Sequence, residues 1–163
     1  MNSHGLLHFD AHFRNILTDG HRIYLGDLGL ATSARFDLSP DEQKFTTQNL
    51  SHDAGHTMME LVNWLVTNIA GTPTLDTSSP TDRNEYIRQC AAGAQPTGVP
   101  APVSAVISRY APVAAVMNDF YRNLYGESRA TPYPAQEITR AMALIPDFAP
   151  TAPQPRPANS HLQ

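Results

Sequence analysis

Residues 51–71 constrain the fold of this chain more than any other stretch. Their apolar side chains recur at the three- and four-residue spacing that is typical of an α-helix. The spaced residues are Met58, Leu61, Val62, Leu65, Val66 and Ile69. Met59 and Trp64 add apolar surface on other sides of the same helix. We therefore predict a central, largely buried helix over residues 52–70.

Both ends of this helix carry boundary signals. Ser51 is a residue type that caps helix N-termini through its side-chain oxygen, and Asp53 suits the positive end of the helix dipole. Gly71 and Pro73 follow the last apolar position, where a glycine and a proline typically end a helix. The signals predict a helix bounded on both sides by loops.

Three further helical segments follow, separated by stretches rich in proline and glycine. We predict helices over 82–92, over 103–126 and over 134–145. Pro112 divides the second segment, so that either two helices or one kinked helix would fit. Residues 147–163 hold several prolines and no apolar period, which predicts a disordered, Pro-rich tail.

The N-terminal part has a different pattern. Asp19-Gly20 separates two short β-prone runs, which is a strong signal for a hairpin with strands near 15–18 and 22–26. Residues 32–50 show no sustained period, and we expect a loop there. The expected fold is mainly α with a small β-hairpin, in one unit over residues 1–146.

Composition narrows the classes of function. The 163 residues suffice for one domain that buries about 68–70% of its unfolded surface. A net charge of −4 and a single lysine, Lys44, disfavour binding to nucleic acid, which depends on clustered basic residues. The single cysteine, Cys90, excludes an internal disulfide and a cysteine zinc site. No signal peptide or membrane span is expected, and we predict a cytoplasmic protein.

Three polar residues near the N-terminus form the main candidate site. Asp10 and Asn15 lie five positions apart, and Asp27 follows Asn15 after the predicted hairpin. A hairpin can fold Asp27 back towards the first two residues. Carboxylate and amide oxygens are ligands that Mg²⁺ accepts together with substrate phosphates, so the set suits a magnesium nucleotide.

These residues carry a family resemblance. His8-Phe9-Asp10 with Asn15 resembles the catalytic loop of the protein-kinase-like superfamily, and Asp27-Leu28-Gly29 resembles its magnesium-binding segment. His12 is similar to the histidine of the aminoglycoside and choline phosphotransferase branch. The resemblance is specific over residues 6–31. It implies a kinase-like C-terminal lobe. In this lobe, residues 1–31 would form the catalytic loop, the hairpin and the magnesium-binding segment, and residues 51–146 would form the helices.

The resemblance also implies roles. Asp10 would orient or accept the proton of an attacking hydroxyl, and Asn15 and Asp27 would hold Mg²⁺. Leu17 would lie under the adenine ring of ATP. His8 would brace the loop, and Asp53 could hold it from the central helix. The expected reaction is transfer of a phosphoryl group from ATP to a hydroxyl-bearing acceptor of unknown identity.

A rival interpretation uses part of the same segment. His8, Asp10 and His12 alternate, so an extended strand would point all three to one side as a zinc or iron set. That interpretation predicts a metal-dependent hydrolase or oxygenase. It gives no role to Asn15 or Asp27.

A third interpretation is a non-catalytic, pseudokinase-like binding module. A kinase-like enzyme needs an N-terminal lobe with a glycine-rich loop and a strand lysine, and Lys44 lies downstream of the motif. We therefore expect that this lobe is inactive alone. It would either belong to a longer parent protein or be completed by an N-terminal lobe supplied in trans by another chain. The missing elements predict exposed apolar surface and self-association.

Overall fold

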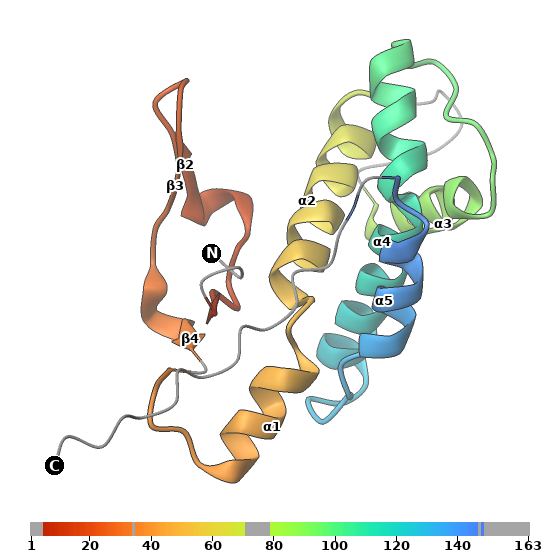
Figure 1. The fold of residues 1–163 in the computed structure, drawn as a ribbon. Coiled ribbons are helices and arrows are strands. Elements are labelled where there is room, and N and C mark those ends of the chain that lie inside the picture. Colours follow the sequence, from red (N-terminus) through yellow and green to blue (C-terminus); the bar gives the residue numbers. More distant parts are fainter. Residues whose placement is uncertain (1–4, 34, 71–78, 147, 149–163) are drawn as a thin grey trace, which may run out of the picture.

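The computed structural model describes residues 5–33, 35–70, 79–146 and 148. The described chain is mainly helical, with a small β region beside a bundle of helices (Figure 1). The β region comprises β1 (Leu6–Leu7), β2 (Ile16–Thr18), β3 (Ile23–Leu25) and β4 (Thr32–Ser33), with short 3-10 turns at Phe13–Asn15 and Leu28–Leu30. The helices are α1 (Pro40–Gln48), α2 (His52–Asn68), α3 (Pro80–Ala91), α4 (Ala101–Gly126) and α5 (Ala135–Ala143).

The apolar core lies within the bundle formed by α2, α3, α4 and α5. Val62 and Val66 of α2 are fully buried, as are Ile107 and Met117 of α4. Gly55 allows α2 to approach α4 closely, because a Cβ atom at this position would lie 3.2 Å from the sulfur of Met117. The core therefore depends on close packing between α2 and α4.

The predicted central helix is confirmed as α2, but two details were wrong. Trp64 is 49% exposed, because α2 is covered by the bundle on one side only. Ser51 has helical backbone angles and makes no capping hydrogen bond. Its hydroxyl instead forms a 2.9 Å hydrogen bond with the hydroxyl of Tyr133, which ties α2 to the segment before α5. The helix ends at Asn68, slightly before the predicted end at residue 70, while Gly71 and Pro73 lie outside the described residues.

The other helices follow the predicted segments closely. Helix α4 is one continuous helix through Pro112, which decides between the two possibilities that the sequence allowed. Helix α3 begins at Pro80, where a proline fits the first turn because that turn needs no amide hydrogen bond. Apart from Phe148, the predicted tail over 147–163 lies outside the described residues.

The predicted hairpin is confirmed as β2 and β3, paired antiparallel with Leu17 opposite Tyr24. Its turn follows from Asp19-Gly20: Gly20 has a positive φ of 89°. The Asp19 carboxylate accepts hydrogen bonds from the backbone amides of His21 and Arg22. A second small sheet pairs β1 with β4, which brings the chain after the hairpin back to its beginning.

The expected loop over 32–50 was wrong, because this stretch contains β4 and helix α1. The helix starts with a complete capping box, in which the Ser39 side chain and the Glu42 side chain each bond the other residue's backbone amide. Pro40 occupies the first helical turn. Most residues of α1 are exposed, so they carry no apolar period. The sequence Ser39-Pro40-Asp41-Glu42 was the signal that could have found this helix.

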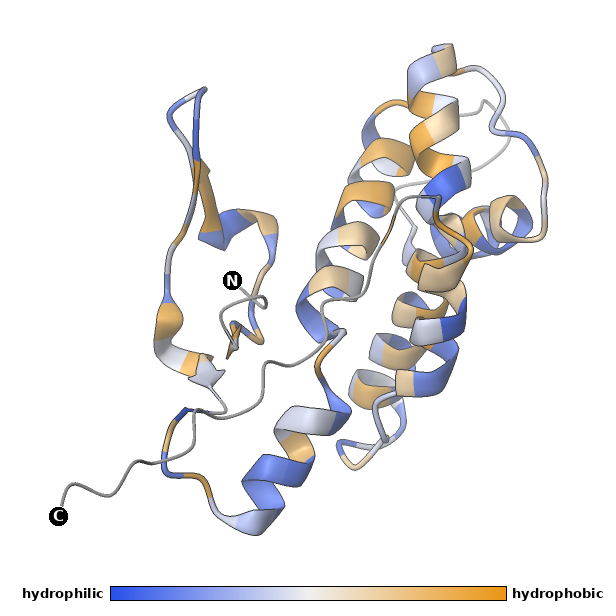
Figure 2. Cartoon of the chain, in the orientation of Figure 1, coloured by the Kyte–Doolittle hydropathy of each residue, from blue (hydrophilic) through white to orange (hydrophobic). Residues whose placement is uncertain are grey.

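The β region holds many apolar residues, and Figure 2 shows hydrophobic stretches of the ribbon in the hairpin and the following turn. Leu17, Ile23, Leu28, Leu30 and Phe36 are each more than half exposed. This agrees with the expectation of uncovered apolar surface, although most of it lies on the β region and not on α2. Within the described ranges, no helix is long and apolar enough to cross a membrane.

The contact between α2 and α4 can be tested by substitution of Gly55. In Gly55→Val, the added methyl groups would meet Met117 and Ile138, whose nearest atoms lie 3.2 Å and 3.7 Å from the Cβ position. We expect a loss of about 1–3 kcal/mol in the free energy of unfolding, measured with urea. Gly126→Val is the matched control, because no atom lies within 4 Å of its Cβ position. Equal stability of the two variants would contradict this packing.

Candidate functional site

The segment after β1 is held by Asp53 from the first turn of α2. The backbone amides of His8 and Phe9 donate hydrogen bonds of 2.7 Å and 2.8 Å to the two carboxylate oxygens of Asp53. Phe9 has a positive φ of 61°, which is unfavourable for a residue with a side chain. The two hydrogen bonds stabilise this backbone conformation. The predicted contact between Asp53 and the loop is thus confirmed.

The protonation of Asp53 reflects the same contacts. Burial raises the pKa of this carboxyl group, but the nearby His52 ring and the amides of His8 and Phe9 outweigh the effect of burial, so that the net pKa is lowered. The Nδ1 atom of His52 lies 3.6 Å from the carboxylate, too far for a good hydrogen bond but close enough for electrostatic attraction. Asp53 is therefore charged at neutral pH, and its hydrogen bonds to the loop are of the stronger, charge-assisted kind.

His8 links the loop to the end of the hairpin. Its ring is fully buried, with Nε2 2.8 Å from the carbonyl oxygen of Gly26 and Nδ1 3.3 Å from the amide of Asp10. Because Nε2–H donates and Nδ1 accepts, one neutral tautomer satisfies both contacts. This position matches the bracing role expected for His8.

The extended strand required by the rival metal interpretation is absent from this segment. Strand β1 ends at Leu7, and the positive φ of Phe9 breaks the alternation that would align His8, Asp10 and His12. Both ring nitrogens of His8 are already engaged. Over the described ranges, no three His, Cys, Asp or Glu side chains are grouped as a metal site.

Asp10 and Asn15 are in direct contact. The Asn15 side-chain amide donates hydrogen bonds of 2.9 Å to the Asp10 carbonyl and 3.0 Å to its carboxylate. The other carboxylate oxygen of Asp10 lies 3.5 Å from Nε2 of His12, and both side chains are about one-third exposed (32%). These contacts fix the orientation of Asp10 and leave part of its carboxylate open to solvent.

Asp27 is joined to this pair through the hairpin. The amide of Gly26 donates a 2.8 Å hydrogen bond to the carbonyl of Asn15, so the residue before Asp27 is fixed beside Asn15. Asp27 adopts the left-handed conformation with φ of 50°, and its exposed carboxylate accepts a long bond of 3.4 Å from Gly29. Leu17 lies on β2 with its side chain 57% exposed.

Two histidines of α2, which the sequence did not single out as site residues, extend this site. His52 and His56 are only 7% and 8% exposed, and their rings pack against each other and against Tyr121 of α4. Nε2 of His52 lies 3.0 Å from the Tyr121 hydroxyl. His52 and His56 lie four residues apart, and Met59 follows His56 by three residues, so all three lie on the buried face of α2. This helical spacing was the sequence signal that could have indicated the burial of the two histidines.

A pocket of about 630 Å³ opens beside Asp10. We call it the Asp10 pocket. It is lined by Phe9, Asp10, His12, Phe13, Arg14, Leu30, His56, Met59, Glu60, Trp64, Tyr121 and Tyr125. A small molecule in this pocket could bring a hydroxyl group next to the Asp10 carboxylate. The geometry thus provides an oriented carboxylate, an amide partner and space for a substrate.

No family model, curated protein or solved structure matches this chain.

His56 predicts how stability depends on pH. Burial, followed by the nearby charges of His52 and His12, lowers its pKa from the ordinary value of 6.5 to about 4. Between these pH values the unfolded chain binds a proton that the folded chain does not, so stability falls as the pH falls. We expect a loss of about 2–3 kcal/mol from His56 by pH 4, measured by urea unfolding across this range.

The variant His56→Phe keeps a ring at this position but cannot titrate, so its stability should vary less between pH 6.5 and 4. His21→Gln removes an exposed histidine of the hairpin turn and serves as the control. An unchanged pH dependence in His56→Phe would show that His56 is not held neutral by burial.

Proposed function

We propose that this chain is the C-terminal lobe of a kinase-like phosphotransferase, which in its full-length parent transfers a phosphoryl group from ATP to a hydroxyl acceptor. The observation that carries the proposal is the contact of Asp10 with Asn15, together with the bond from Gly26 that fixes the hairpin beside Asn15. These contacts hold Asp10 against Asn15 and fix the residue before Asp27 beside Asn15.

Asp10 would act on the acceptor. The acceptor oxygen forms a bond to the γ-phosphorus, the bond between that phosphorus and the ADP oxygen breaks, and the hydroxyl proton passes to the Asp10 carboxylate. Positioning contributes much of the rate in such reactions, because the transition state is loose. The hydrogen bonds from Asn15 to Asp10 supply this positioning.

Asn15 and Asp27 fit a role as Mg²⁺ ligands. The Asn15 amide nitrogen faces Asp10, so the amide oxygen faces away and can bind a cation. The Asp27 carboxylate is exposed, and its hydrogen-bond partner among the described residues is the amide of Gly29, at a long distance of 3.4 Å. Mg²⁺ commonly binds through one or two carboxylates together with substrate phosphates, and it would neutralise the charge of those phosphates.

Nucleotide binding would require further groups. These 163 residues contain no glycine-rich loop before the motif, and the only lysine, Lys44, lies on the exposed surface of α1. Leu17 would support one face of the adenine ring, while an N-terminal lobe would have to cover the other. The exposed apolar side chains of the hairpin suit such a cover.

This proposal predicts that the isolated chain binds MgATP weakly or not at all. Calorimetric titration should give a dissociation constant above about 1 mM, because the groups that hold the phosphates from above are missing. Micromolar affinity, or turnover of ATP by this chain alone, would contradict the requirement for a second lobe.

In a longer parent that is active, the proposed roles can be tested directly. Asp10→Ala and Asp27→Asn should each lower kcat by about 100-fold or more, because one orients the acceptor and the other holds Mg²⁺. Asp19→Asn is the control, since Asp19 is another exposed carboxylate of the hairpin and lies in its turn. Near-normal rates in either test variant would refute that residue's role, and near-normal rates in both would favour a non-catalytic module.

A further inference from the structure

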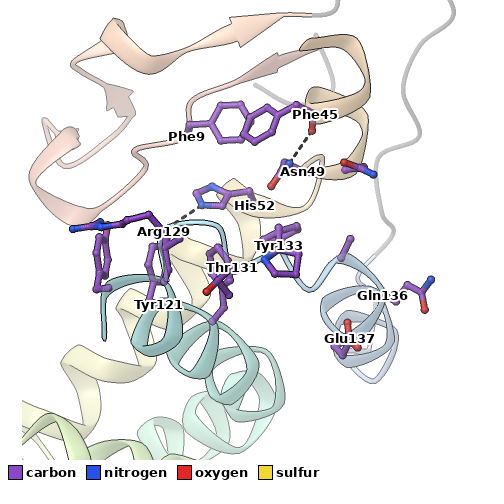
Figure 3. A pocket seen from close by; sticks show the side chains of 16 residues that line it. Phe9, Phe45, Asn49, His52, Tyr121, Arg129, Thr131, Tyr133, Gln136 and Glu137 are labelled. Atoms are coloured by element: carbon purple, nitrogen blue, oxygen red, sulfur yellow. Dashed lines mark hydrogen bonds between the residues drawn. The ribbon is translucent and has the colours of Figure 1, made fainter. Parts of the chain in front are cut away.

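A second, larger pocket lies between α1, the start of α2, the end of α4 and the segment leading into α5 (Figure 3). Its volume is about 780 Å³, and we call it the aromatic pocket. Its aromatic lining consists of Phe9, Phe45, Phe120, Tyr121, Tyr133 and Tyr125. The phosphotransfer proposal assigns no role to this pocket.

The aromatic side chains present flat apolar faces. Phe9 and Phe45 pack with ring centroids 5.4 Å apart, and Figure 3 shows them on one side of the pocket, across from Tyr121 and Tyr133. Tyr121 and Tyr125 are stacked, with an angle of 12° between their rings. Such surfaces favour a planar ring, because stacked and tilted ring contacts stabilise beyond simple burial.

One cation is placed at this pocket without an acidic partner. The guanidinium carbon of Arg129 lies 4.6 Å from the centre of the Tyr125 ring. A guanidinium group stacked on a ring keeps the N–H groups at its edge free for an oxyanion. Among the described residues, Arg129 forms no ion pair, although Glu137 lines the same pocket.

Glu137 stands away from Arg129 in the pocket. Figure 3 shows Arg129 and Glu137 on opposite sides of the view, with Thr131 between them. The two side chains form no ion pair in the part of the chain that the structure describes. The Arg129 end of the pocket remains positive, next to the exposed ring of Tyr125.

We propose that the aromatic pocket binds a planar ring that carries an anionic group, with the ring between the aromatic side chains and the anion at Arg129. The pocket meets the Asp10 pocket at Phe9, Tyr121 and Tyr125, which line both. A ligand held here would lie next to the proposed acceptor site. The binding itself requires neither nucleotide nor phosphotransfer.

The test uses three probes that share one ring and differ in charge: 2-naphthoate, 2-naphthamide and 2-naphthylmethylammonium. Their dissociation constants are measured by NMR titration of the full chain without nucleotide. We expect 2-naphthoate to bind roughly three- to fivefold more tightly than 2-naphthamide, as for an exposed ion pair, and the cationic probe to bind most weakly.

Variants separate the charge from the ring. Arg129→Gln should remove the preference for 2-naphthoate over 2-naphthamide, whereas Arg140→Gln, on the exposed surface of α5 and outside the pocket, should keep it. Glu137→Gln should keep the preference or increase it. Phe45→Ala should weaken all three probes, and because the Phe45 ring is 54% exposed, this variant should remain folded.

Three outcomes would overturn the proposal: no measurable binding of any probe, equal affinity for the anionic and neutral probes, or a preference that survives in Arg129→Gln. None of these results would bear on phosphotransfer, since Arg129 does not line the Asp10 pocket. Conversely, if Asp10→Ala did not change the activity of the parent enzyme, the phosphotransfer proposal would fail, but the expected preference of the aromatic pocket for an anionic ring would be unaffected.

Discussion

The two hydrogen bonds from the loop amides to Asp53 are the interaction on which the candidate site depends. The main apolar core lies in α2, α3, α4 and α5, and the residues of the β region do not contribute to it. Besides the packing of the Phe9 ring on His52, polar contacts position the loop against the bundle. Asp53 holds the amides of His8 and Phe9, and a weaker contact of 3.4 Å joins the Thr57 hydroxyl to the carbonyl of Ala11.

From Asp53, a chain of contacts leads to each candidate residue. The anchored loop buries His8, and the His8 ring meets the carbonyl of Gly26 at the end of the hairpin. Gly26 in turn bonds the backbone of Asn15, and the Asn15 side chain bonds Asp10. Each link uses a buried or half-buried polar group with a defined partner, which favours one arrangement over many. The bundle stabilises the chain, and this network gives the loop its shape.

The features that follow from local chemistry could be predicted from the sequence. Asp19-Gly20 specified the hairpin turn, and the apolar period specified α2. Asp10 and Asn15, which the sequence grouped in one candidate site, are in direct contact. Helix α1 was missed because its exposed surface has no apolar period, and its capping box was the only signal. The contact of His52 with Tyr121 and the contact of Ser51 with Tyr133 depend on residues far away in the chain, which no local pattern reveals.

Hydrogen exchange of the His8 and Phe9 amides tests most directly whether Asp53 holds the loop. In the unaltered chain these amides should be protected, because both are bonded to the carboxylate. In Asp53→Ala they should exchange freely, while amides of the α2 and α4 core, such as those of Val62 and Met117, stay protected. Asp53→Asn, which keeps one acceptor, should give an intermediate result if the alanine variant fails to fold. Undiminished protection of His8 and Phe9 in these variants would contradict the account.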